Sequence, residues 1–500
     1  MKLSSIPGIV LVSVALISLG AVPGFLAFLQ FLLLPFSNKA SHMEETAAYY
    51  PNVAVVIPAW DEALSLTASI TAMLRQEYPP DRLRVYLVDD ASTDQTPQIM
   101  RDLVLKYPGQ LFYLRRKKGG EGKAAALNYG FEKVLKSNWA QALMIMDADV
   151  IFMPDTLRKM TRHLADPIVG AVSCYIREKS TTNHWLSQYI AAEYAIAQAA
   201  ARRTFNVIGY QPCLAGGSQL HSRENFEAIG GRIDTSTLAE DTYTTLRTQQ
   251  LGRKVFFDGS TEVWAEEPAT ISSLWGQRIR WARGNIQISK AFTKTWFRPV
   301  PTTTYGKKIF YDLIWFSLLY MPFIATIATA FLIYIYITNP AEAWYLLHFS
   351  AYICFICWFY VLFASAAADP ATAKRCWRST LLFPGIVSLV IVTCCTFRPQ
   401  MGWLVHHLAA LLTGNSDWVP TADSMMIFAY IWIAIAMPMT GLAKYLEDRN
   451  VKYLPRILVL FCGYGSLLLA AAFTAWFREF RHADRVWHKT VKYGSIEVLP

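Results

Sequence analysis

Charged side chains are scarce in this chain, and its cysteines follow no recognisable spacing. Only 17% of the 500 residues are Asp, Glu, Lys or Arg, while 53% are hydrophobic and 14% aromatic. This balance is too apolar for a soluble enzyme and predicts membrane segments. The eight cysteines lack metal-type and disulfide-framework spacing, so we expect reduced thiols. Five of them lie in apolar runs, where cysteine behaves as a small hydrophobe: Cys354, Cys357, Cys394, Cys395 and Cys462.

The apolar residues gather in runs at both ends of the chain. Residues 8–35 carry no charge and are long enough to cross a hydrocarbon core of roughly 30 Å. The alternative is a cleaved signal peptide, but the run is about twice the usual length and no small-x-small cleavage site closes it. We therefore expect a retained anchor. Further apolar runs lie at 313–337, 344–368, 381–397, 425–443 and 457–477.

The formal net charge of +10 allows a nucleic-acid-binding reading, but the basic residues sit beside the apolar runs. Positive charge next to a membrane span is typical of cytoplasmic segments that face anionic lipid. We therefore expect the lipid bilayer as a partner and no nucleic acid. The basic residues in question are Lys307 and Lys308; Lys374, Arg375 and Arg378; and Arg478, Arg481 and Arg485.

The topology of these segments is only partly determined by the sequence. Placing 374–378 and the tail from Arg478 in the cytosol leaves a third basic group, at 444–456, on the opposite side, against the positive-inside tendency. The conflict depends on whether 403–413 crosses the membrane together with 381–397, re-enters, or lies flat.

The mixed-polarity region between the first two runs predicts an α/β fold with an open, mostly parallel sheet. Five nearly continuous apolar stretches read as strands buried on both faces, at 52–58, 84–90, 111–114, 142–149 and 169–174, with amphipathic stretches such as 64–76 and 95–106 between them. Ligands of such sheets bind beyond the carboxyl ends of the strands. These ends carry Asp61 and Glu62, Asp89 and Asp90, and Asp147 and Asp149.

A further helix is expected over 183–203, where apolar and aromatic residues recur at i, i+4 spacing. It either lies along the membrane surface, which we favour, or packs as a core helix.

Several short motifs could carry chemistry, each with a structural alternative. Asp147 and Asp149, two apart at a strand end, can hold a hard divalent cation together with a diphosphate. Asp90 can accept hydrogen bonds from a nucleobase or ribose, although Ser92 and Asp94 also fit a helix cap. Lys123 follows a Gly-rich loop whose amides could face phosphate oxygens, without the spacing of a P-loop.

Two motifs follow later in the chain. Glu240 and Asp241 precede a helical stretch, where an acidic pair can be merely a helix N-terminal signal. In QRIRW, Gln277, Arg280 and Trp281 share one helical face; Arg pairs with phosphate and Trp stacks on a sugar ring, whereas a surface helix with a stray Trp is the alternative.

Taken together, VVIPAWDE, VDDASTDQT, GKAAALN, MDADV, AEDT and QRIRW occur in this order within one α/β unit flanked by apolar runs. That order resembles the membrane-embedded family-2 glycosyltransferases, among them cellulose synthase catalytic subunits, poly-N-acetylglucosamine synthases and hyaluronan synthases. The resemblance covers roughly 50–290. It implies a GT-A-like domain inserted between transmembrane helices.

The resemblance also implies roles for individual residues. Asp90 matches the aspartate that reads the nucleotide, usually uridine, and Asp147 and Asp149 match the aspartates that bind the cation, Mg or Mn, and the diphosphate. Asp241 matches the general base for the acceptor hydroxyl, with Glu240 beside it on the acceptor side. Gln277 and Arg280 match residues that hold the diphosphate, and Trp281 one that stacks the acceptor sugar. Asp61, Glu62 and Lys123 are assigned to the donor site.

Three departures from the family pattern stand out. Trp60, Asp61 and Glu62 replace the usual Tyr-Asn-Glu, and Ala239 stands where Thr usually precedes the acidic pair. The acceptor-side loop at 214–225 matches no single subfamily, which leaves the sugar open.

The resemblance implies a processive, inverting hexosyltransferase. It would polymerise a UDP-sugar into a β-linked polysaccharide, of glucan or N-acetylglucosamine type, and translocate it, with accessory export subunits as further partners. The rivals are a non-processive transferase acting on a lipid-linked acceptor and a non-catalytic transporter. The implied organisation is a transmembrane helix at 1–36, a cytosolic transferase domain at 37–272, an interfacial region with QRIRW at 273–308, a transmembrane bundle at 309–477 and a basic cytosolic tail at 478–500. Within that tail, 485–494 resembles tail segments that approach the active site.

Overall fold

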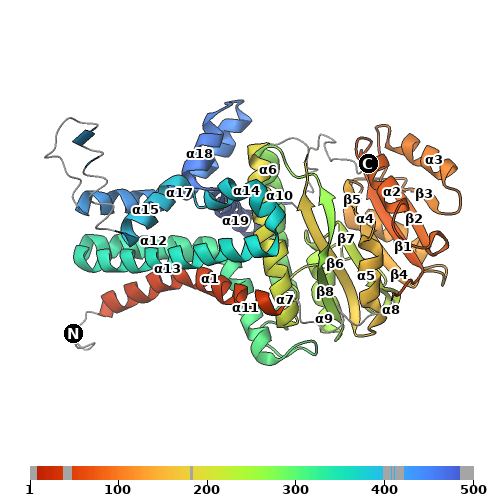
Figure 1. The fold of residues 1–500 in the computed structure, drawn as a ribbon, viewed down its shortest axis with the longest axis horizontal. Helices are drawn as coiled ribbons and strands as arrows, with labels where there is room; N and C mark the ends of the chain where they lie inside the picture. The colour runs from red at the N-terminus through yellow and green to blue at the C-terminus, as the bar shows by residue number, and fades with distance from the viewer. Residues whose placement is uncertain are drawn as a thin grey trace.

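The structure is a computed structural model that describes residues 8–37, 48–180, 184–397, 407, 410–411 and 422–484. It joins an α/β unit to a group of long apolar helices (Figure 1). The tail segment 485–494 and most of 403–413 lie outside the described residues.

A mixed sheet of eight strands organises the α/β unit, in the order β3-β2-β1-β4-β7-β6-β8-β5. The first four of these are mutually parallel, and β7 runs antiparallel to both of its neighbours. β6 and β8 are parallel to each other, while β5 is antiparallel to β8. The predicted fold class, α/β with a mostly parallel sheet, is confirmed. The strands are β1 (Val53–Ala59), β2 (Leu83–Asp89), β3 (Leu111–Arg115), β4 (Ala142–Met146), β5 (Val150–Phe152), β6 (Val169–Glu178), β7 (Ser218–Ser222) and β8 (Lys254–Ala265).

Helices cover both faces of this sheet, because alternate residues of the central strands point to opposite sides. Val53, Val55 and Ile57 of β1 pack with one set of helices, α2 (Leu66–Leu74), α3 (Thr96–Lys106) and α5 (Thr156–Arg162). Ala54 and Val56 pack with the other set, α4 (Lys123–Val134) and α8 (Arg223–Ala228). Burial on both faces explains why these strands read as continuous apolar runs.

The structure corrects the expected strand 142–149. The chain leaves the sheet after Met146 and re-enters it at Val150, so Asp147 and Asp149 lie in the turn between β4 and β5. Strands β5, β7 and β8 were not predicted. β7 reads SQLHS, with buried polar residues, and β8 is interrupted by a register shift near Gly259, so neither shows an apolar run.

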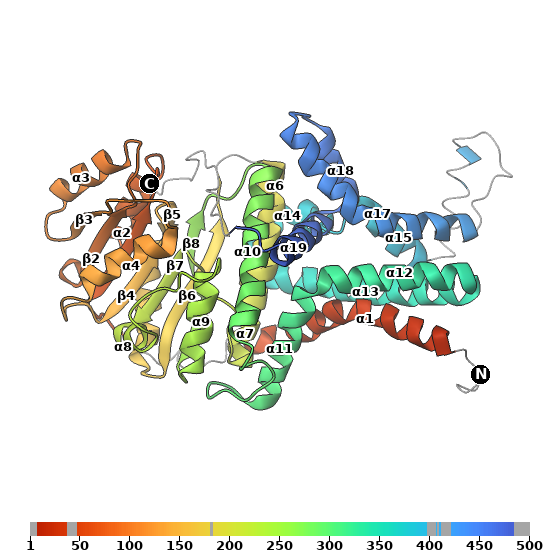
Figure 2. The same ribbon diagram turned by 180° about the vertical axis from the view of Figure 1, so that it is seen from behind.

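The helix expected over 183–203 is present from Trp185 and continues to Ile208. It comprises α6 (Trp185–Tyr194), a π-helical turn η6 (Ala195–Ala200) and α7 (Ala201–Ile208). It packs on β6 on one side and on the apolar helices α13 and α14 on the other. The helix therefore lies between the sheet and the apolar helices (Figure 2).

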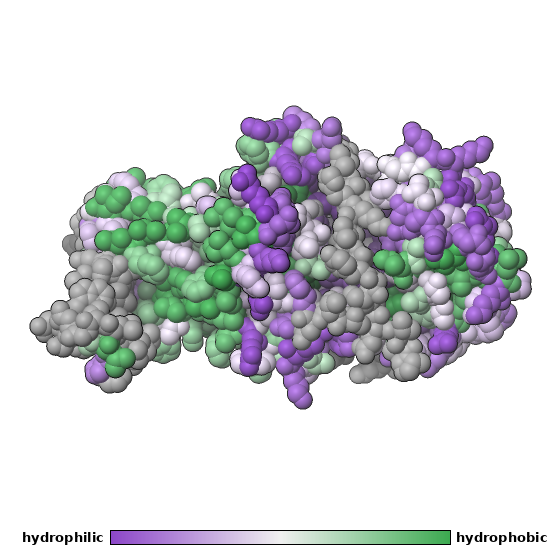
Figure 3. Space-filling model, turned by 90° about the horizontal axis from the view of Figure 1, so that it is seen from above, coloured by the Kyte–Doolittle hydropathy of each residue, from purple (hydrophilic) through white to green (hydrophobic). Residues whose placement is uncertain are grey.

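Among the described residues, four helices are long and apolar enough to cross a membrane: Gly8–Phe36, Met321–Thr338, Pro340–Ala368 and Met426–Asp448. The first comprises α1 (Gly8–Phe31) and η2 (Leu34–Phe36), and the others belong to α12 (Met321–Thr338), α13 (Pro340–Ala368) and α17 (Ala422–Asp448). The run at 313–337 is divided, because α11 (Tyr305–Leu319) ends inside it. Hydrophobic surface covers this end of the molecule (Figure 3).

Two further candidates are bent pairs, which bring the count to as many as six. α14 (Pro370–Leu381) meets α15 (Ile386–Thr396) at 79°, and α18 (Leu454–Cys462) meets α19 (Tyr464–Phe480) at 96°. The two bends touch at Gly385 and Gly463, both with positive φ, and a Cβ on either glycine would overlap the other segment's backbone. Only glycine allows this approach.

Three basic segments lie beside the α/β unit: 374–378, 444–456 and the start of the tail at Arg478. Arg375 of α14 donates to Glu178 of β6 at 3.0 Å. Glu447, at the end of α17, accepts the N–H groups of Ile271 and Ser272, which begin α10 (Ile271–Ala291). Glu479, at the end of α19, pairs with an arginine of α10. Helix α14 and the ends of α17 and α19 are therefore all held against the α/β unit.

Candidate active site

Asp89 and Asp90, at the end of β2, have different surroundings. Asp89 is fully buried and accepts hydrogen bonds from Tyr113, at 3.0 Å, and Arg115, at 2.6 Å, so it ties β2 to β3. Asp90 forms an ion pair with Arg116 and accepts the N–H of Gly120 at 3.4 Å. Asp90 is therefore the carboxylate of this pair that faces the Gly-rich loop.

The chain after β1 turns sharply through Asp61, which adopts a φ of 53°. One carboxylate oxygen of Asp61 accepts the N–H groups of Thr93, at 2.8 Å, and Asp94, at 3.3 Å. The N–H of Glu62 donates to the Thr96 hydroxyl at 2.8 Å. Asp61 and Glu62 thus hold the turn after β1 against the turn after β2, so Asp61 has a structural role beside the donor role predicted for it.

Lys123 and Asp147 form an ion pair across the carboxyl end of the sheet. The Lys123 ammonium also donates to the Gly216 carbonyl at 2.9 Å. Burial alone lowers the pKa of a lysine, but Asp147 and then Glu240 outweigh it, so the pKa of Lys123 lies above its ordinary value. Arg116 and Lys123 stand at the two ends of one loop. Because Arg116 pairs with Asp90 and Lys123 with Asp147, that loop links the two carboxylates.

Gly216 and Gly217 lie between the predicted cation ligand Asp147 and the predicted general base Asp241. A Cβ at Gly216 would lie 3.3 Å from the Asp241 carboxylate, and one at Gly217 would lie 3.2 Å from the Asp147 carboxylate. The backbone entering β7 therefore runs between Asp147 and Asp241 without a side chain between them.

Glu240 and Asp241 occupy the first turn of α9 (Glu240–Gln250), where a helix dipole favours negative charge. Burial and the neighbouring Asp241 raise the pKa of the Glu240 carboxyl, and Lys123 and Arg280 oppose that shift. The positive charge of Arg280, on α10, therefore stabilises the same carboxylate, Glu240, as Lys123 does. The structure brings together Lys123, Asp147, Glu240, Asp241 and Arg280.

A divalent cation fits this site only together with a substrate. Within the described residues there is no group of three or more His, Cys, Asp or Glu side chains that could hold a metal. Asp147 and Asp149, the two predicted ligands, would supply two hard carboxylates; the Asp149 residue is 8% exposed. Mg²⁺ typically binds through one or two carboxylates plus substrate phosphates and water. The donor set therefore suits a cation that arrives with a diphosphate.

The side chain of Gln277 forms hydrogen bonds with Glu267, just before α10, and with Arg278 on α10. Its side-chain N–H donates to Glu267 at 3.4 Å, and its oxygen accepts from Arg278. Arg278 also donates twice to Glu193 of α6, at 3.1 and 2.7 Å. Burial raises the pKa of the Glu267 carboxyl to about 7. Arg278, the second residue of the QRIRW motif, is thus a buried anchor.

The same Arg278 lies over the Trp281 ring, 4.2 Å from its centroid. Trp281 also packs beside the buried cluster formed by α6, α10 and the α18–α19 bend, a cluster that includes Tyr189 and Tyr464. The indole orientation is therefore fixed by contacts on the domain side and the membrane side together. Its predicted stacking on an acceptor stays a prediction.

Sequence reasoning assigned no role to Arg116, Glu193, Glu267 or Arg278. Arg278 could have been weighed, since it stands inside QRIRW, and Arg116 lies close to the Gly-rich loop. Glu193 and Glu267 have no local signal, because their partners are 85 and 10 positions away.

Comparison with known families shows a match over residues 51–284 to the family described as "Glycosyltransferase like family 2". The probable glycosyltransferase YdaM of Bacillus subtilis is 30% identical over 301 residues, which cover 58% of this chain and 67% of that protein. The β-monoglucosyldiacylglycerol synthase of Synechocystis is 32% identical over 242 residues, 48% of each chain. The poly-β-1,6-N-acetyl-D-glucosamine synthase of Staphylococcus epidermidis is 24% identical, over 51% of this chain and 59% of that protein.

Apart from the Bacillus protein, the chain spans about half the length of these relatives. Among solved structures, a mannosyltransferase of Pyrobaculum calidifontis, determined in complex with GDP-Man and Mn²⁺, is similar with a TM-score of 0.47 and 23% identity. That alignment covers 72% of this chain and 99% of the mannosyltransferase.

Proposed function

This chain belongs to the family 2 glycosyltransferases, and from its site we propose that it is a processive, inverting synthase of a β-linked polysaccharide that uses a UDP-sugar. The observation that carries the transferase chemistry is the convergence of Asp147, Lys123 and Asp241 on the Gly216–Gly217 backbone. A donor diphosphate and an acceptor hydroxyl both need groups of these kinds, close together.

In the proposed reaction, the acceptor hydroxyl oxygen attacks the anomeric carbon of the donor. The bond from that carbon to the diphosphate oxygen breaks, and Asp241 takes the hydroxyl proton. Lys123 and Arg280 offset negative charge on the departing diphosphate. Direct displacement inverts the anomeric centre, so an α-linked donor gives a β-linkage.

The proposal includes a divalent cation, Mg²⁺ or Mn²⁺, held by Asp147 and Asp149 with the diphosphate. When bound, the cation neutralises charge on the leaving group. Lys123 already bonds Asp147, so it contributes positive charge at the same end of the donor. We assign nucleotide contacts to Asp90 and to the turn at Asp61 and Glu62.

Polymerisation and export are proposed from the position of α10. This helix carries Gln277, Arg280 and Trp281 and packs along α19, which continues from the bent membrane-side segment α18. A chain end held at Trp281 would therefore lie where the α/β unit meets the apolar helices. Export subunits are proposed partners for this step.

A second candidate is a single transfer to a lipid acceptor. The similarity to a β-monoglucosyldiacylglycerol synthase, 32% over the matched region, favours it. The apolar helices would then hold a lipid rather than a polymer.

One experiment separates the two candidates. Purified membranes are incubated with a panel of nucleotide-sugars, and the product is sized and subjected to linkage analysis. A long β-linked product from a UDP-sugar supports the synthase. A lipid carrying one sugar replaces it with the second candidate.

We also propose that the α/β unit is cytosolic. The three basic segments lie beside that unit, and positive charge collects on the cytoplasmic side of membrane proteins. Cysteines introduced at exposed positions of the unit, such as Asp81, should react with a membrane-impermeant thiol reagent only after the cells are opened. Labelling in intact cells would reverse the orientation.

A further inference from the structure

A cavity of about 400 Å³ lies where the α/β unit meets the apolar helices, apart from the transferase site. One wall belongs to the apolar helices and the other to α7 and β8. The residues that matter for its chemistry are Leu34, Pro35, Arg203, Gly259, Ser260 and Ala368.

The cavity lies at the level of the polar edge of two candidate spans. Leu34 and Pro35 come within the last three residues of the span Gly8–Phe36, and Ala368 ends the span Pro340–Ala368. The ends of membrane-crossing helices coincide with the headgroup layer of a bilayer. The cavity therefore borders the layer that contains lipid phosphates.

Arg203 contributes the only cationic side chain among the described residues that line this cavity. Its guanidinium donates to the carbonyls of Ala199, at 2.7 Å, and Ala368, at 2.8 Å, and also to that of Gly259. It lies so close to Gly259 that any Cβ there would overlap it. The guanidinium is thus fixed in place, and a glycine in β8 makes room for it.

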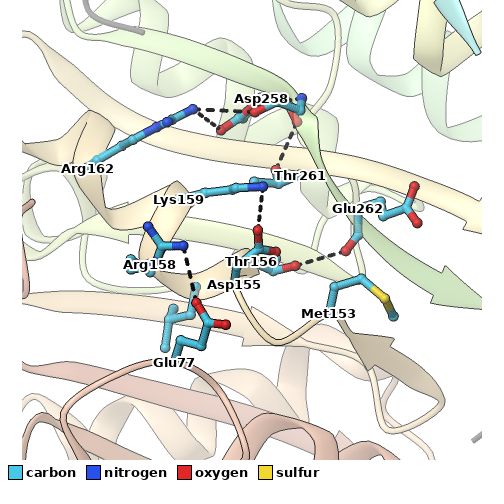
Figure 4. A network of polar contacts seen from close by, with 12 residues as sticks. Glu77, Met153, Asp155, Thr156, Arg158, Lys159, Arg162, Asp258, Thr261 and Glu262 are labelled. Carbon is cyan, nitrogen blue, oxygen red and sulfur yellow. Dashed lines mark hydrogen bonds and ion pairs between the residues drawn. The ribbon is translucent and has the colours of Figure 1, made fainter. Parts of the chain in front are cut away.

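No carboxylate among the described residues is within ion-pair distance of this guanidinium. Asp258 is occupied by Arg162 at 3.1 Å, His163 at 2.9 Å and Ser260 (Figure 4 shows Arg162 and Asp258). Asp369 is occupied by Tyr175 at 2.9 Å and Arg177 at 3.2 Å.

Burial lowers the pKa of the Arg203 guanidinium, and Tyr175, Asp369 and Asp258 oppose that shift without reversing it. Arg203 is half-buried, and its guanidinium bonds only carbonyl oxygens at close range, so an anion bound beside it would balance its charge. An arginine fork is also the side chain best suited to phosphate.

We propose that this cavity binds the phosphate headgroup of an anionic membrane phospholipid, with Arg203 as the cationic ligand and the ends of α1 and α13 beside the acyl chains. The site would tie the α/β unit to the bilayer independently of the transferase chemistry. Any phospholipid carries a phosphate, but only a lipid with net negative charge also balances the positive charge of the half-buried Arg203.

The test uses the full chain in nanodiscs of phosphatidylcholine, with and without phosphatidylglycerol, and measures the thermal midpoint. A ligand that binds only the folded protein raises that midpoint. Wild type should gain at least about 2 °C from phosphatidylglycerol. Arg203→Gln should lose the gain, while Arg449→Gln, which removes an exposed arginine near the end of α17, should keep it.

Ser260→Trp serves as the second variant, because Ser260 is exposed and the indole would fill the cavity while leaving Arg203 in place. It should lose the gain as Arg203→Gln does, and it decides the matter if Arg203→Gln does not fold. Inorganic phosphate added to phosphatidylcholine discs distinguishes a site for lipid phosphate from a site for free phosphate. If phosphate alone reproduces the gain, the site binds free phosphate and the lipid proposal is overturned. The proposal also fails if the Ser260→Trp variant keeps the gain, or if Arg449→Gln loses it as fully as Arg203→Gln.

Discussion

Arg283 of α10 and Glu479 at the end of α19 form a nearly buried ion pair, with the guanidinium Nε 2.6 Å from a carboxylate oxygen. The same oxygen accepts the amide of Gln287 at 2.9 Å, and the other end of Gln287 accepts the N–H of Leu238 at 2.9 Å. Leu238 stands two residues before Glu240. The membrane-side helix α19 is therefore joined through α10 to the loop that leads into Glu240 and Asp241, the proposed catalytic pair.

This link predicts that Glu479→Ala lowers kcat while the KM for the donor changes little. Removing one partner of a buried pair leaves Arg283 uncompensated, at a cost of roughly 3–5 kcal/mol, and frees Gln287. Steady-state kinetics of the variant checks this, with Glu224→Gln, which breaks an exposed pair with Arg253, as the control. A changed KM at constant kcat would instead place Glu479 in donor binding.

Asp241→Asn should abolish transfer while nucleotide-sugar affinity stays near that of wild type. A general base contributes roughly 10²–10⁴-fold to rate and little to donor binding. Turnover is compared with affinity measured calorimetrically, and Asp81→Asn, an exposed aspartate, is the matched control. Retention of more than about a tenth of the activity would show that another residue is the base.

Chelation of divalent cations should abolish transfer, and Mg²⁺ or Mn²⁺ should restore it. The reason is that the described residues supply only two carboxylates, so the cation is shared with the donor and exchanges with solution. The measurement is donor turnover across a chelator titration. Full activity in excess chelator would leave Lys123 and Arg280 as the groups that balance the diphosphate.

Trp281→Ala should shorten the product with almost unchanged donor affinity, because stacking holds the chain end between additions. Trp281→Phe should keep part of the length, since an aromatic face remains. Product size on gels is compared with donor turnover for both variants. Polymer of wild-type length from Trp281→Ala would leave this residue a packing role, against Arg278 and the cluster with Tyr189 and Tyr464.

The raised pKa of the Glu267 carboxyl predicts that the stability of the protein depends on pH. This pKa is raised to about 7, mainly by burial, among Arg278, Tyr194, Gln277 and Glu178. In the unfolded chain a glutamate releases its proton at about pH 4.3, whereas folded Glu267 keeps its proton up to about pH 7. Between these pH values the folded chain binds more protons than the unfolded chain. The free energy of unfolding therefore falls as the pH rises towards 7.

Glu267→Gln cannot titrate, so its thermal midpoint relative to wild type should rise across this window. The contribution is of the order of 3 kcal/mol, the equivalent of the shift. Thermal unfolding followed at several pH values measures it, and Glu224→Gln should show a constant difference from wild type. A Glu267→Gln difference that is also constant would mean that Glu267 is ionised throughout.

The sequence alone predicted the α/β class, most of the parallel strands and the order of the motifs. It could do so because strands buried on both faces must be continuously apolar, and because carboxylates at strand ends are local features. It missed β7 and β8, since polar residues such as Gln219 and Asp258 are buried there with partners that are distant in the chain. The split of the predicted strand at Asp147 was also invisible, because β4 pairs with β7 whereas β5 pairs with the distant β8.

What the sequence by itself determined is which residue types stand at the site: Asp90, Asp147, Asp241 and the QRIRW helix. The tertiary structure alone decided how they are held. Gly216 and Gly217 separate two carboxylates that are 94 positions apart, and Glu447 and Glu479 hold α10 from the membrane side. A local pattern records backbone propensity and burial, whereas an ion pair between distant residues depends on where the whole chain places its two charges, and that position is fixed only when the sheet and the apolar helices pack together.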